Sequence, residues 1–491
     1  MNSSPIKQLA GETAIYGLST VLARVLNFLF VPLYTRLLTT AEYGTATEFL
    51  AYIAILQVVL TMGLETGCFR FANKHDRPEQ VFSSALGTVL VVSLLFLGAC
   101  SLFAKPIALG LGYLGYERCI VWFGAILAID NFTSILFAKL RFEHKAVRFA
   151  VFKIIKISGE LVFNLLLFLV LPGYLRLHPD SFLARYLSPV PDFSYILLAI
   201  FLSCVLVMLL FIPQLCKKGA FGFHPTLWKK MMRYSLPLML AGLPGILNDF
   251  SDRIMFRFLI PAPKVWQSEL GIFQAGVKLA VLMMLFIQMF RFAAEPFFFA
   301  QAKEGQSRAL YAKVFNYFTA FLVTVFLGVL LYIDVIGLIL GRDFRAGISI
   351  LPIMLFGYLL LGMSFNVSIW YKLSEKTSMA LYITCAGLLI TLVVNLMFMP
   401  RFGYVAAAWA HLLSYAVILG INVALGQKYY PVPYRWGRVG LYMGVGLAIW
   451  VVTLILPAMP LALKLSIHTI FILGYLFFIW RIERATLNLH D

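Results

Sequence analysis

The residues of this 491-residue chain that could do chemistry are a few charged side chains set deep inside apolar segments. Arg24 sits at the middle of the apolar stretch 13–37, with Asn27 one turn further on. Lys278 lies about 12 Å inside another apolar stretch, at 1.5 Å of rise per residue, and has no acid three or four positions away. Because a charge in hydrocarbon is costly, such groups face protein, water or a partner. A guanidinium offers a fork of donors that matches phosphate oxygens, so an anion site is one interpretation.

Further basic residues fall at other depths of the apolar segments. Arg70 and Arg291 stand at ends that are expected to face the cytoplasm, whereas Arg253 and Arg257 lie in the opposite half of their segment. If these side chains face a common interior, they form a ladder of positive charge across the membrane together with the two deep cations. The predicted substrate-binding set is Arg24, Asn27, Arg70, Arg253, Lys278 and Arg291.

Structural roles for the same charges are the competing hypothesis. Spacing i,i+4 allows neutralisation within one helix for three pairs, which are Lys156 and Glu160, Asp249 and Arg253, and Arg291 and Glu295. Glu65 lies close to Arg70 in the sequence. Asp130, at the centre of its apolar stretch, could form a buried ion pair with Arg24. Asp130 and Glu65 are also the candidates for a coupling proton or sodium ion.

Composition indicates which elements hold these charges. Hydrophobic residues make up 61% of the chain and charged residues only 13%, about half of the roughly 25% usual in soluble domains. So little charge cannot cover the surface of a soluble protein of this length, which disfavours cytosolic enzymes, nucleic-acid-binding proteins and disordered scaffolds. The net charge of +18 is expected from the cytoplasmic loops of a membrane protein.

Membrane helices need about 20 mostly apolar residues, and fourteen stretches meet that condition. They are 13–37, 45–69, 80–104, 119–140, 150–171, 194–215, 232–259, 270–294, 309–333, 347–371, 378–399, 403–425, 438–457 and 461–480. The longest connection, 172–193, is rich in proline and is predicted to be a loop, too short for a catalytic domain.

Basic residues predict the orientation. With the N-terminus in the cytoplasm, the 40 Lys and Arg residues fall on the cytoplasmic side more than twice as often as on the other, and an even number of spans places both termini there. The largest clusters, Lys139 to Lys153 and Lys217 to Lys230, follow the fourth and sixth spans and would attract anionic membrane lipids.

Short motifs recur in the two halves of the chain. They pair Tyr16-Gly17-Leu18-Ser19 with Tyr234-Ser235-Leu236-Pro237, Glu42-Tyr43-Gly44 with Glu269-Leu270-Gly271, and Arg70-Phe71 with Arg291-Phe292. Three matches in order predict a duplicated six-helix unit, hence a parallel repeat about an axis along the membrane normal. The predicted fold is an all-α polytopic membrane protein with two six-helix lobes, 1–216 and 217–428, and two additional helices in 429–491.

The seventh predicted span carries Pro237 and Pro244. Proline removes a helix hydrogen bond, so these residues predict either a static kink or a hinge for alternating access. Gly63 and Gly67 have the spacing of closely packed helices.

Seven short motifs carry a family resemblance. They are residues 9–18 (LAGETAIYGL), 31–36 (VPLYTR), 42–44 (EYG), 63–71 (GLETGCFRF), 235–237 (SLP), 252–253 (DR) and 290–299 (FRFAAEPFFF). They resemble the polysaccharide-transporter, or oligosaccharide flippase, family, whose superfamily also holds MATE multidrug exporters and lipid II flippases. The resemblance implies two six-helix lobes around a central cavity and export of a polyprenyl-diphosphate-linked oligosaccharide across the bacterial inner membrane.

Three other functions remain open at this point, and a lipid II flippase of the same fold is one of them. A cation-coupled multidrug exporter of the same fold should hold acids in its cavity, whereas the first span has a central Arg24 and no central acid. A membrane glycosyltransferase or polymerase usually has a larger external domain. The sequence has no nucleotide-binding P-loop and no metal-ligand cluster, so we expect no cofactor and no direct use of ATP. A polysaccharide polymerase and other assembly proteins are conceivable partners, and nucleic acid is not expected to be one.

Overall fold

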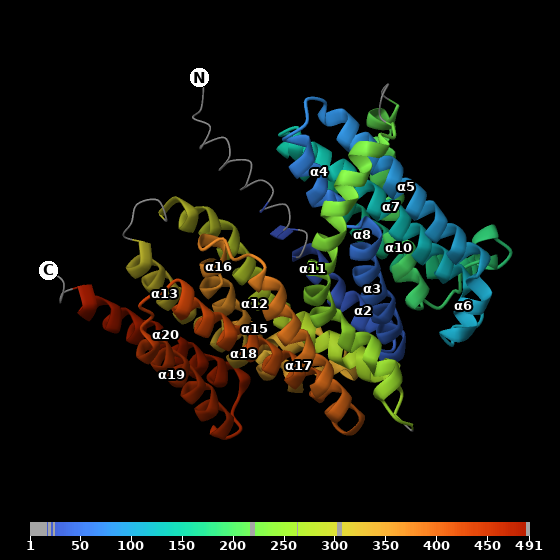
Figure 1. The fold of residues 1–491 in the computed structure, drawn as a ribbon. Helices are drawn as coiled ribbons and strands as arrows, with labels where there is room; N and C mark the ends of the chain where they lie inside the picture. Colours follow the sequence, from blue (N-terminus) through green and yellow to red (C-terminus); the bar gives the residue numbers. More distant parts are fainter. Residues whose placement is uncertain are drawn as a thin grey trace. The chain divides into compact units, whose positions relative to one another are not determined.

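Helices are the only regular elements in the part of the chain that the computed structural model describes, which is residues 17, 21–22, 25–216, 221–262, 264–301 and 307–487 (Figure 1). Contacts divide the chain into two compact units, Met1–Gly271 and Ile272–Asp491. This division falls inside one helix, α12 (Trp266–Gln301), because α11 (Pro225–Leu259) packs on earlier helices of the first unit. The lobe limits at 216 and 428 remain a prediction.

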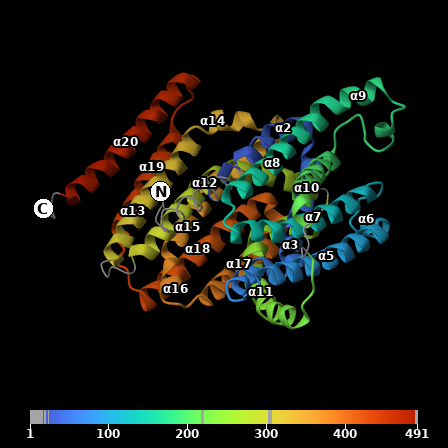
Figure 2. The same ribbon diagram turned by 90° about the horizontal axis from the view of Figure 1, so that it is seen from above.

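The first unit is a bundle of helices that pack against one another. Its other elements are α2 (Phe30–Leu37), α3 (Thr40–Thr61), α4 (Leu64–Ala72), α5 (Pro78–Leu102), α6 (Ala104–Gly110), α7 (Glu117–Phe142), α8 (Ala146–Leu165), α9 (Leu171–Leu177) and α10 (Phe193–Leu215). Helix α7 packs against α5, α10 and α3, and both ribbon views show α5 beside α7 (Figure 2). Edge-to-face contacts between aromatic rings join α7 and α8 to α10. The centre of the Phe211 ring lies 5.1 Å from that of Phe137 and 4.9 Å from that of Phe152.

The second predicted span is divided into two helices. Helix α3 begins at a capping box in which Thr39 and Glu42 satisfy each other's backbone amides, five residues before the predicted start. Met62 and Gly63 then adopt left-handed backbone angles, with φ of 51° and 67°, which ends α3 and starts α4. The span is therefore longer than predicted and carries a break that periodicity does not reveal.

The proline-rich connection 172–193 is partly helical. Helix α8 continues through a π-helical turn, Leu166–Val170, into α9, which carries Pro172 in its first turn. Proline lacks an amide donor, and the widened turn lies where that donor would be missing. The loop that the sequence predicts is thus confined to the residues after Leu177.

The second unit is also a helical bundle. Besides most of α12 it contains α13 (Ser307–Leu331), α14 (Ile333–Ile336), α15 (Leu351–Val367), α16 (Ile369–Leu373), α17 (Met379–Phe402), α18 (Tyr404–Tyr429), α19 (Trp436–Ile455) and α20 (Leu461–Leu487). Helix α18 packs against α15 and α17, while α13 packs against α15, α19 and α20. A nine-residue 3₁₀ segment, Arg342–Ile350, leads into α15.

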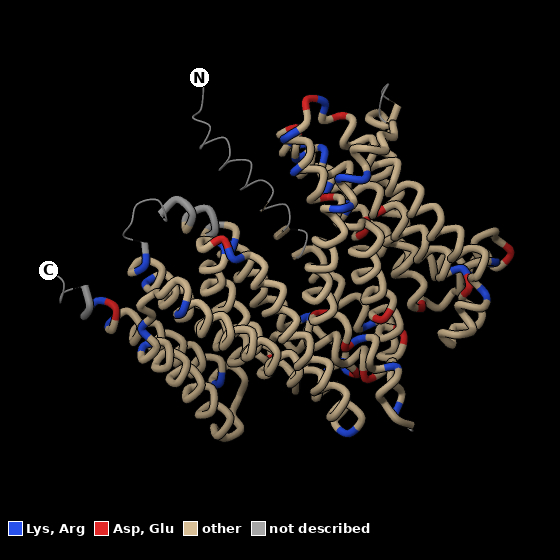
Figure 3. The backbone as a smooth tube through the Cα atoms, viewed as in Figure 1, with Lys and Arg blue, Asp and Glu red and all other residues tan. Residues whose placement is uncertain are grey.

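Twelve helices among the described residues are long and apolar enough to cross a membrane. The two remaining predicted spans correspond to α11, which has 35 residues but several charged and proline residues, and to the segment Val25–Leu37, whose preceding residues lie mostly outside the described ranges. Lys and Arg gather toward helix ends in each unit and leave mostly uncharged middles (Figure 3). The count of fourteen is compatible with this structure and stays a prediction.

Candidate functional site

A cavity of about 90 Å³ in the second unit brings cations and an unpaired amide together. Its lining comes from α12, α15 and the segment that follows α15, and consists of Phe290, Arg291, Ala294, Phe298, Phe365, Asn366, Ser368, Ile369, Tyr371 and Lys372. Two of these side chains, Arg291 and Lys372, are basic, and none of the described lining residues is acidic. The described part of the lining is therefore positive.

The guanidinium of Arg291 lies 5.0 Å from the centre of the Phe365 ring. An aromatic face attracts a cation and holds it without neutralising its charge, so the exposed guanidinium keeps donors for a further group. Lys372 of α16 is half-buried and lines the same cavity. A diphosphate or another multiply charged anion fits this pair of cations.

Asn366, like Ser368, is a buried polar residue of this cavity. Its side chain is 2% exposed, and neither Nδ2 nor Oδ1 has a hydrogen-bond partner. Leaving a buried polar group unpaired costs about 1–3 kcal/mol, so a ligand or a water molecule that pairs with Asn366 would be stabilised there. Nδ2 can donate to an anion, and Oδ1 can accept from a hydroxyl.

Trp370 anchors the short helix that carries Lys372. The indole is fully buried, packs against Gly426 of α18 and donates from Nε1 to Asn422 Oδ1 at 3.3 Å. Asn422 in turn donates to Ser364 Oγ of α15 at 3.0 Å. A side chain at Gly426 would press on this indole, since an added Cβ would lie 3.1 Å from Trp370 Cδ1. The lining is thus held by two helices rather than by a loop.

The predicted coupling residues both carry cation partners from other helices. Asp130 of α7 forms an ion pair with Lys156 of α8, with Oδ1 2.5 Å from Nζ. Asp130 Oδ1 also accepts a hydrogen bond from Cys204 Sγ at 3.3 Å. Glu65 of α4 pairs with Arg141 of α7. The partners suggested by the sequence were Arg24 for Asp130 and Arg70 for Glu65. Arg24 lies outside the described residues, and Arg70 instead stacks on Tyr234, 4.1 Å from the ring centre.

The cations of α11 are compensated within the first unit. Arg253 is 8% exposed, pairs with Asp252 at 3.0 Å and donates to the Asp249 backbone carbonyl. Arg257 binds Glu48 through both carboxylate oxygens at 2.5 Å. Both guanidinium groups thus have partners within the first unit, and their part in the cationic ladder that the sequence suggested stays a prediction.

Glu48 is a residue that the sequence analysis missed. Its side chain is fully buried and also accepts a hydrogen bond from Tyr113, while Arg257 reaches the Leu111 carbonyl at 2.9 Å. Burial and the Glu48 carboxylate raise the pKa of the Tyr113 hydroxyl, which therefore stays a donor. The sequence analysis did not recognise Glu48 as a charge inside a span, because it expected the span to begin at residue 45. Helix α3 begins at Thr40, so Glu48 lies two turns inside it.

The remaining predicted site residues are placed singly. Asn27 is half-buried in the described part of the first span, and Lys278 is half-buried on α12. Lys278 precedes Arg291 by about 20 Å along that helix, at 1.5 Å per residue, and does not line the cavity. Pro237 and Pro244 both lie inside the continuous helix α11.

Two sequence comparisons match proteins of polysaccharide or glycan biosynthesis. The model of a family described as polysaccharide biosynthesis protein matches residues 9–301. The probable low-salt glycan biosynthesis flippase Agl15 of Haloferax volcanii is 20% identical over 439 residues, covering 88% of this chain and 86% of that protein.

Solved transporters share the fold. The lipid II flippase MurJ in an inward closed conformation has a TM-score of 0.73 at 12% identity, covering 96% of this chain and 99% of that chain. An outward-facing MATE family multidrug resistance transporter of the MOP superfamily has a TM-score of 0.58 at 12% identity, covering 90% and 99%. The all-helical membrane fold expected from the sequence is confirmed.

Proposed function

Because the chain belongs to the family of polysaccharide biosynthesis proteins, we propose that it is a flippase for a polyprenyl-diphosphate-linked oligosaccharide. It would carry this lipid across the bacterial inner membrane for cell-surface polysaccharide synthesis, by alternating access of the two predicted lobes around a cationic cavity. Both termini would be cytoplasmic. A polysaccharide polymerase would be a partner that receives the exported glycan. The name and fold of the relatives support a transporter rather than an enzyme.

The observation that carries this proposal is the positive cavity with its unpaired Asn366. A diphosphate must lose water to cross a membrane, and fixed cations can replace part of that hydration. Arg291 and Lys372 supply charge for the phosphates, and Asn366 supplies one donor and one acceptor. The other members of the predicted set stay candidates for other parts of the route; they are Arg24, Asn27, Arg70, Arg253 and Lys278.

A multidrug exporter of the same fold is the alternative. Its cationic substrates would be repelled by a cavity lined by Arg291 and Lys372 without a described acid. Asp130 and Glu65 remain the candidates for a coupling proton or sodium ion. Each is paired with a cation, Lys156 or Arg141, so a coupling ion would have to replace that partner.

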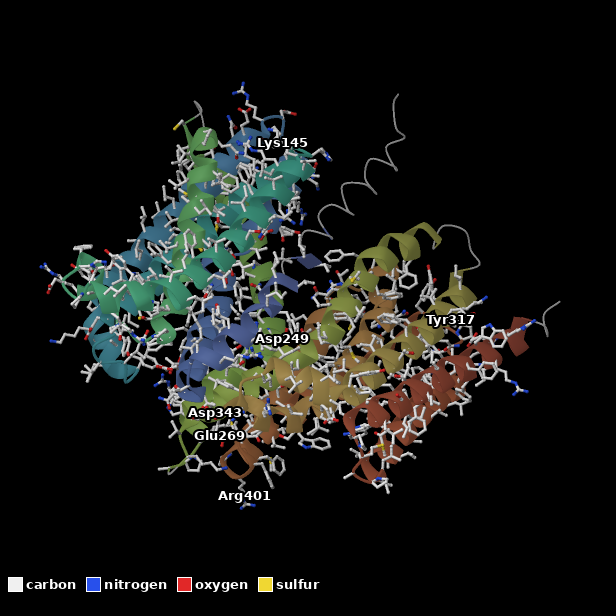
Figure 4. All side chains as sticks on the ribbon, turned by 180° about the vertical axis from the view of Figure 1, so that it is seen from behind. Lys145, Asp249, Glu269, Tyr317, Asp343 and Arg401 are labelled. Atoms are coloured by element: carbon white, nitrogen blue, oxygen red, sulfur yellow. The ribbon has the colours of Figure 1, made fainter. Side chains whose placement is uncertain are left out.

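The test is flipping of a fluorescent polyprenyl-diphosphate oligosaccharide by the purified protein in vesicles. Arg291→Ala and Asn366→Leu should each slow flipping about tenfold or more, because each removes a hydrogen bond to a charged group. Arg291→Lys should recover part of the rate, since it keeps the charge and loses the fork. The control is Arg401→Ala, which removes an exposed cation that lies at the end of α17 and outside the cavity (Figure 4).

Two results would count against this function. Unchanged flipping by both Arg291→Ala and Asn366→Leu, in protein that is folded and inserted, would remove the cavity from the transport route. Efflux of cationic drugs by the wild type that is unaffected by Arg291→Ala would favour the multidrug exporter.

A further inference from the structure

A second, larger cavity of about 480 Å³ lies between helix ends of the second unit. Its lining comes from the first turns of α13, the segment 433–438 that leads into α19, and the end of α20, and consists of Ala309, Leu310, Ala312, Lys313, Asn316, Tyr317, Pro433, Arg435, Arg438 and Glu483. Tyr317, which is labelled in Figure 4, is one of these lining residues. The cavity shares no lining residue with the Arg291 cavity, so it is a separate site.

The charges of this cavity are mostly positive. Lys313 and Arg435 are exposed, and Arg438 lies 3.6 Å from Glu483, the one acid among the described lining residues. Glu483 also accepts a hydrogen bond from Tyr442. Glu483 is one acid against the three cations Lys313, Arg435 and Arg438, so the described lining has a net charge of +2. This net positive charge favours binding of an anion.

Asn316 provides an independent sign of a ligand. The residue is 4% exposed, and its Oδ1 is buried without a hydrogen-bond donor. Oδ1 can only accept, so cations of the protein or a hydroxyl of a ligand are its possible partners. An anion that also carries a hydroxyl satisfies the cations and Asn316 together.

The position of the cavity indicates a lipid rather than a soluble anion. It lies at the ends of three helices that are long and apolar enough to cross a membrane. Trp436 begins α19 and Trp480 lies near the end of α20, and both rings are exposed, as is typical of side chains at the level of the lipid headgroups. The charge bias places these ends on the cytoplasmic side, where basic pockets between helices bind anionic headgroups.

We propose that this cavity binds the headgroup of an anionic phospholipid of the phosphoglycerol type. Lys313, Arg435 and Arg438 hold the phosphate, and Asn316 accepts a hydrogen bond from a headgroup hydroxyl. The chemistry recognised is a phosphate ester next to a hydroxyl, and a soluble glycerol phosphate offers this chemistry without the acyl chains. This lipid is a resident of the membrane and not the transported cargo.

The test compares thermal unfolding of the full chain in nanodiscs of phosphatidylcholine with and without phosphatidylglycerol. Phosphatidylglycerol should raise the midpoint temperature of the wild type. The variant Lys313→Gln/Arg435→Gln should lose at least half of that rise and bind the lipid about tenfold more weakly, because each removed cation weakens attraction to an anionic lipid. The matched control Arg481→Gln removes an exposed cation of α20 that does not line the cavity, and it should keep the rise.

A second variant tests the proposed hydrogen bond between Asn316 and a headgroup hydroxyl, by comparing two lipids on the same folded protein. Asn316→Leu should reduce the preference for phosphatidylglycerol over phosphatidic acid, which lacks the headgroup hydroxyls, as measured by native mass spectrometry. An unchanged temperature rise in Lys313→Gln/Arg435→Gln would overturn the site. The same rise produced by soluble glycerol phosphate in phosphatidylcholine nanodiscs would overturn the assignment to a lipid.

Discussion

Arg257 is the cation whose loss we expect to destabilise the first unit most. Its guanidinium compensates Glu48, whose side chain is fully buried, so Arg257→Ala leaves an uncompensated charge. Removing one member of a buried pair typically costs about 3–5 kcal/mol. The midpoint temperature of unfolding in detergent should fall strongly, whereas Arg176→Ala, at the exposed end of α9, should change it little. The variant Arg257→Met/Glu48→Gln should recover most of the loss, and failure to recover would contradict this account of the pair.

Asp130 is a partly buried acid for which two cation partners, Lys156 and Arg24, can be distinguished by experiment. Asp130→Ala should destabilise the protein because it leaves the Lys156 ammonium without its 2.5 Å partner. Asp130→Ala/Lys156→Met should then be more stable than Asp130→Ala alone. The pairing with Arg24 considered from the sequence predicts instead that Asp130→Ala/Arg24→Ala is the recovering variant. Thermal unfolding of the three variants decides between these partners.

At the scale of elements, glycines set how closely α4 can approach α11. A Cβ at Gly63 would lie 2.5 Å from the Ser235 carbonyl oxygen, and a Cβ at Gly67 would collide with the Ser235 hydroxyl. The close packing expected from the spacing of these glycines is confirmed. Gly63→Ala should destabilise more than Gly67→Ala, because it meets backbone and has φ of +67°. Gly87→Ala, which meets nothing within 4 Å, should be neutral or stabilising in the same unfolding assay.

Helix α11 contains the two prolines that the sequence proposed as a hinge. Its continuity through Pro237 and Pro244 leaves the choice between a static kink and a hinge to experiment. Replacing both with Ala restores two helix hydrogen bonds, so the protein should fold and insert while flipping becomes slower. The control Pro225→Ala changes a proline in the first turn of the same helix, where no donor is lost. A normal flipping rate in the double variant would leave only the static kink.

At the scale of the whole molecule, the charge bias predicts that both termini are cytoplasmic. Single cysteines at Val190, in the connection before α10, and at Arg484, near the end of α20, test this in a background without the exposed Cys216 and Cys385. Val190→Cys should react with an impermeant maleimide in intact cells, and Arg484→Cys only after permeabilisation. Labelling of Arg484→Cys from outside would contradict a cytoplasmic C-terminus.

What the sequence by itself determined rests on local properties. Low charge and long apolar stretches indicated the membrane class and the position of most helices, and short motifs indicated the family. These properties belong to neighbouring residues, so no packing has to be known to recognise them. The limits of helices were less certain, because the capping box before α3 and the left-handed turn at Met62 act on backbone hydrogen bonds rather than on hydrophobicity.

Only the tertiary structure decided which charges meet. The sequence could propose partners four residues apart, but Arg257 and Glu48 are separated by 209 positions and Arg141 and Glu65 by 76. The Arg291 cavity likewise depends on Lys372 and Asn366, which lie on other elements and which the sequence did not single out. A helix fixes the distance between residues one turn apart, whereas the distance between residues of different helices depends on how those helices pack.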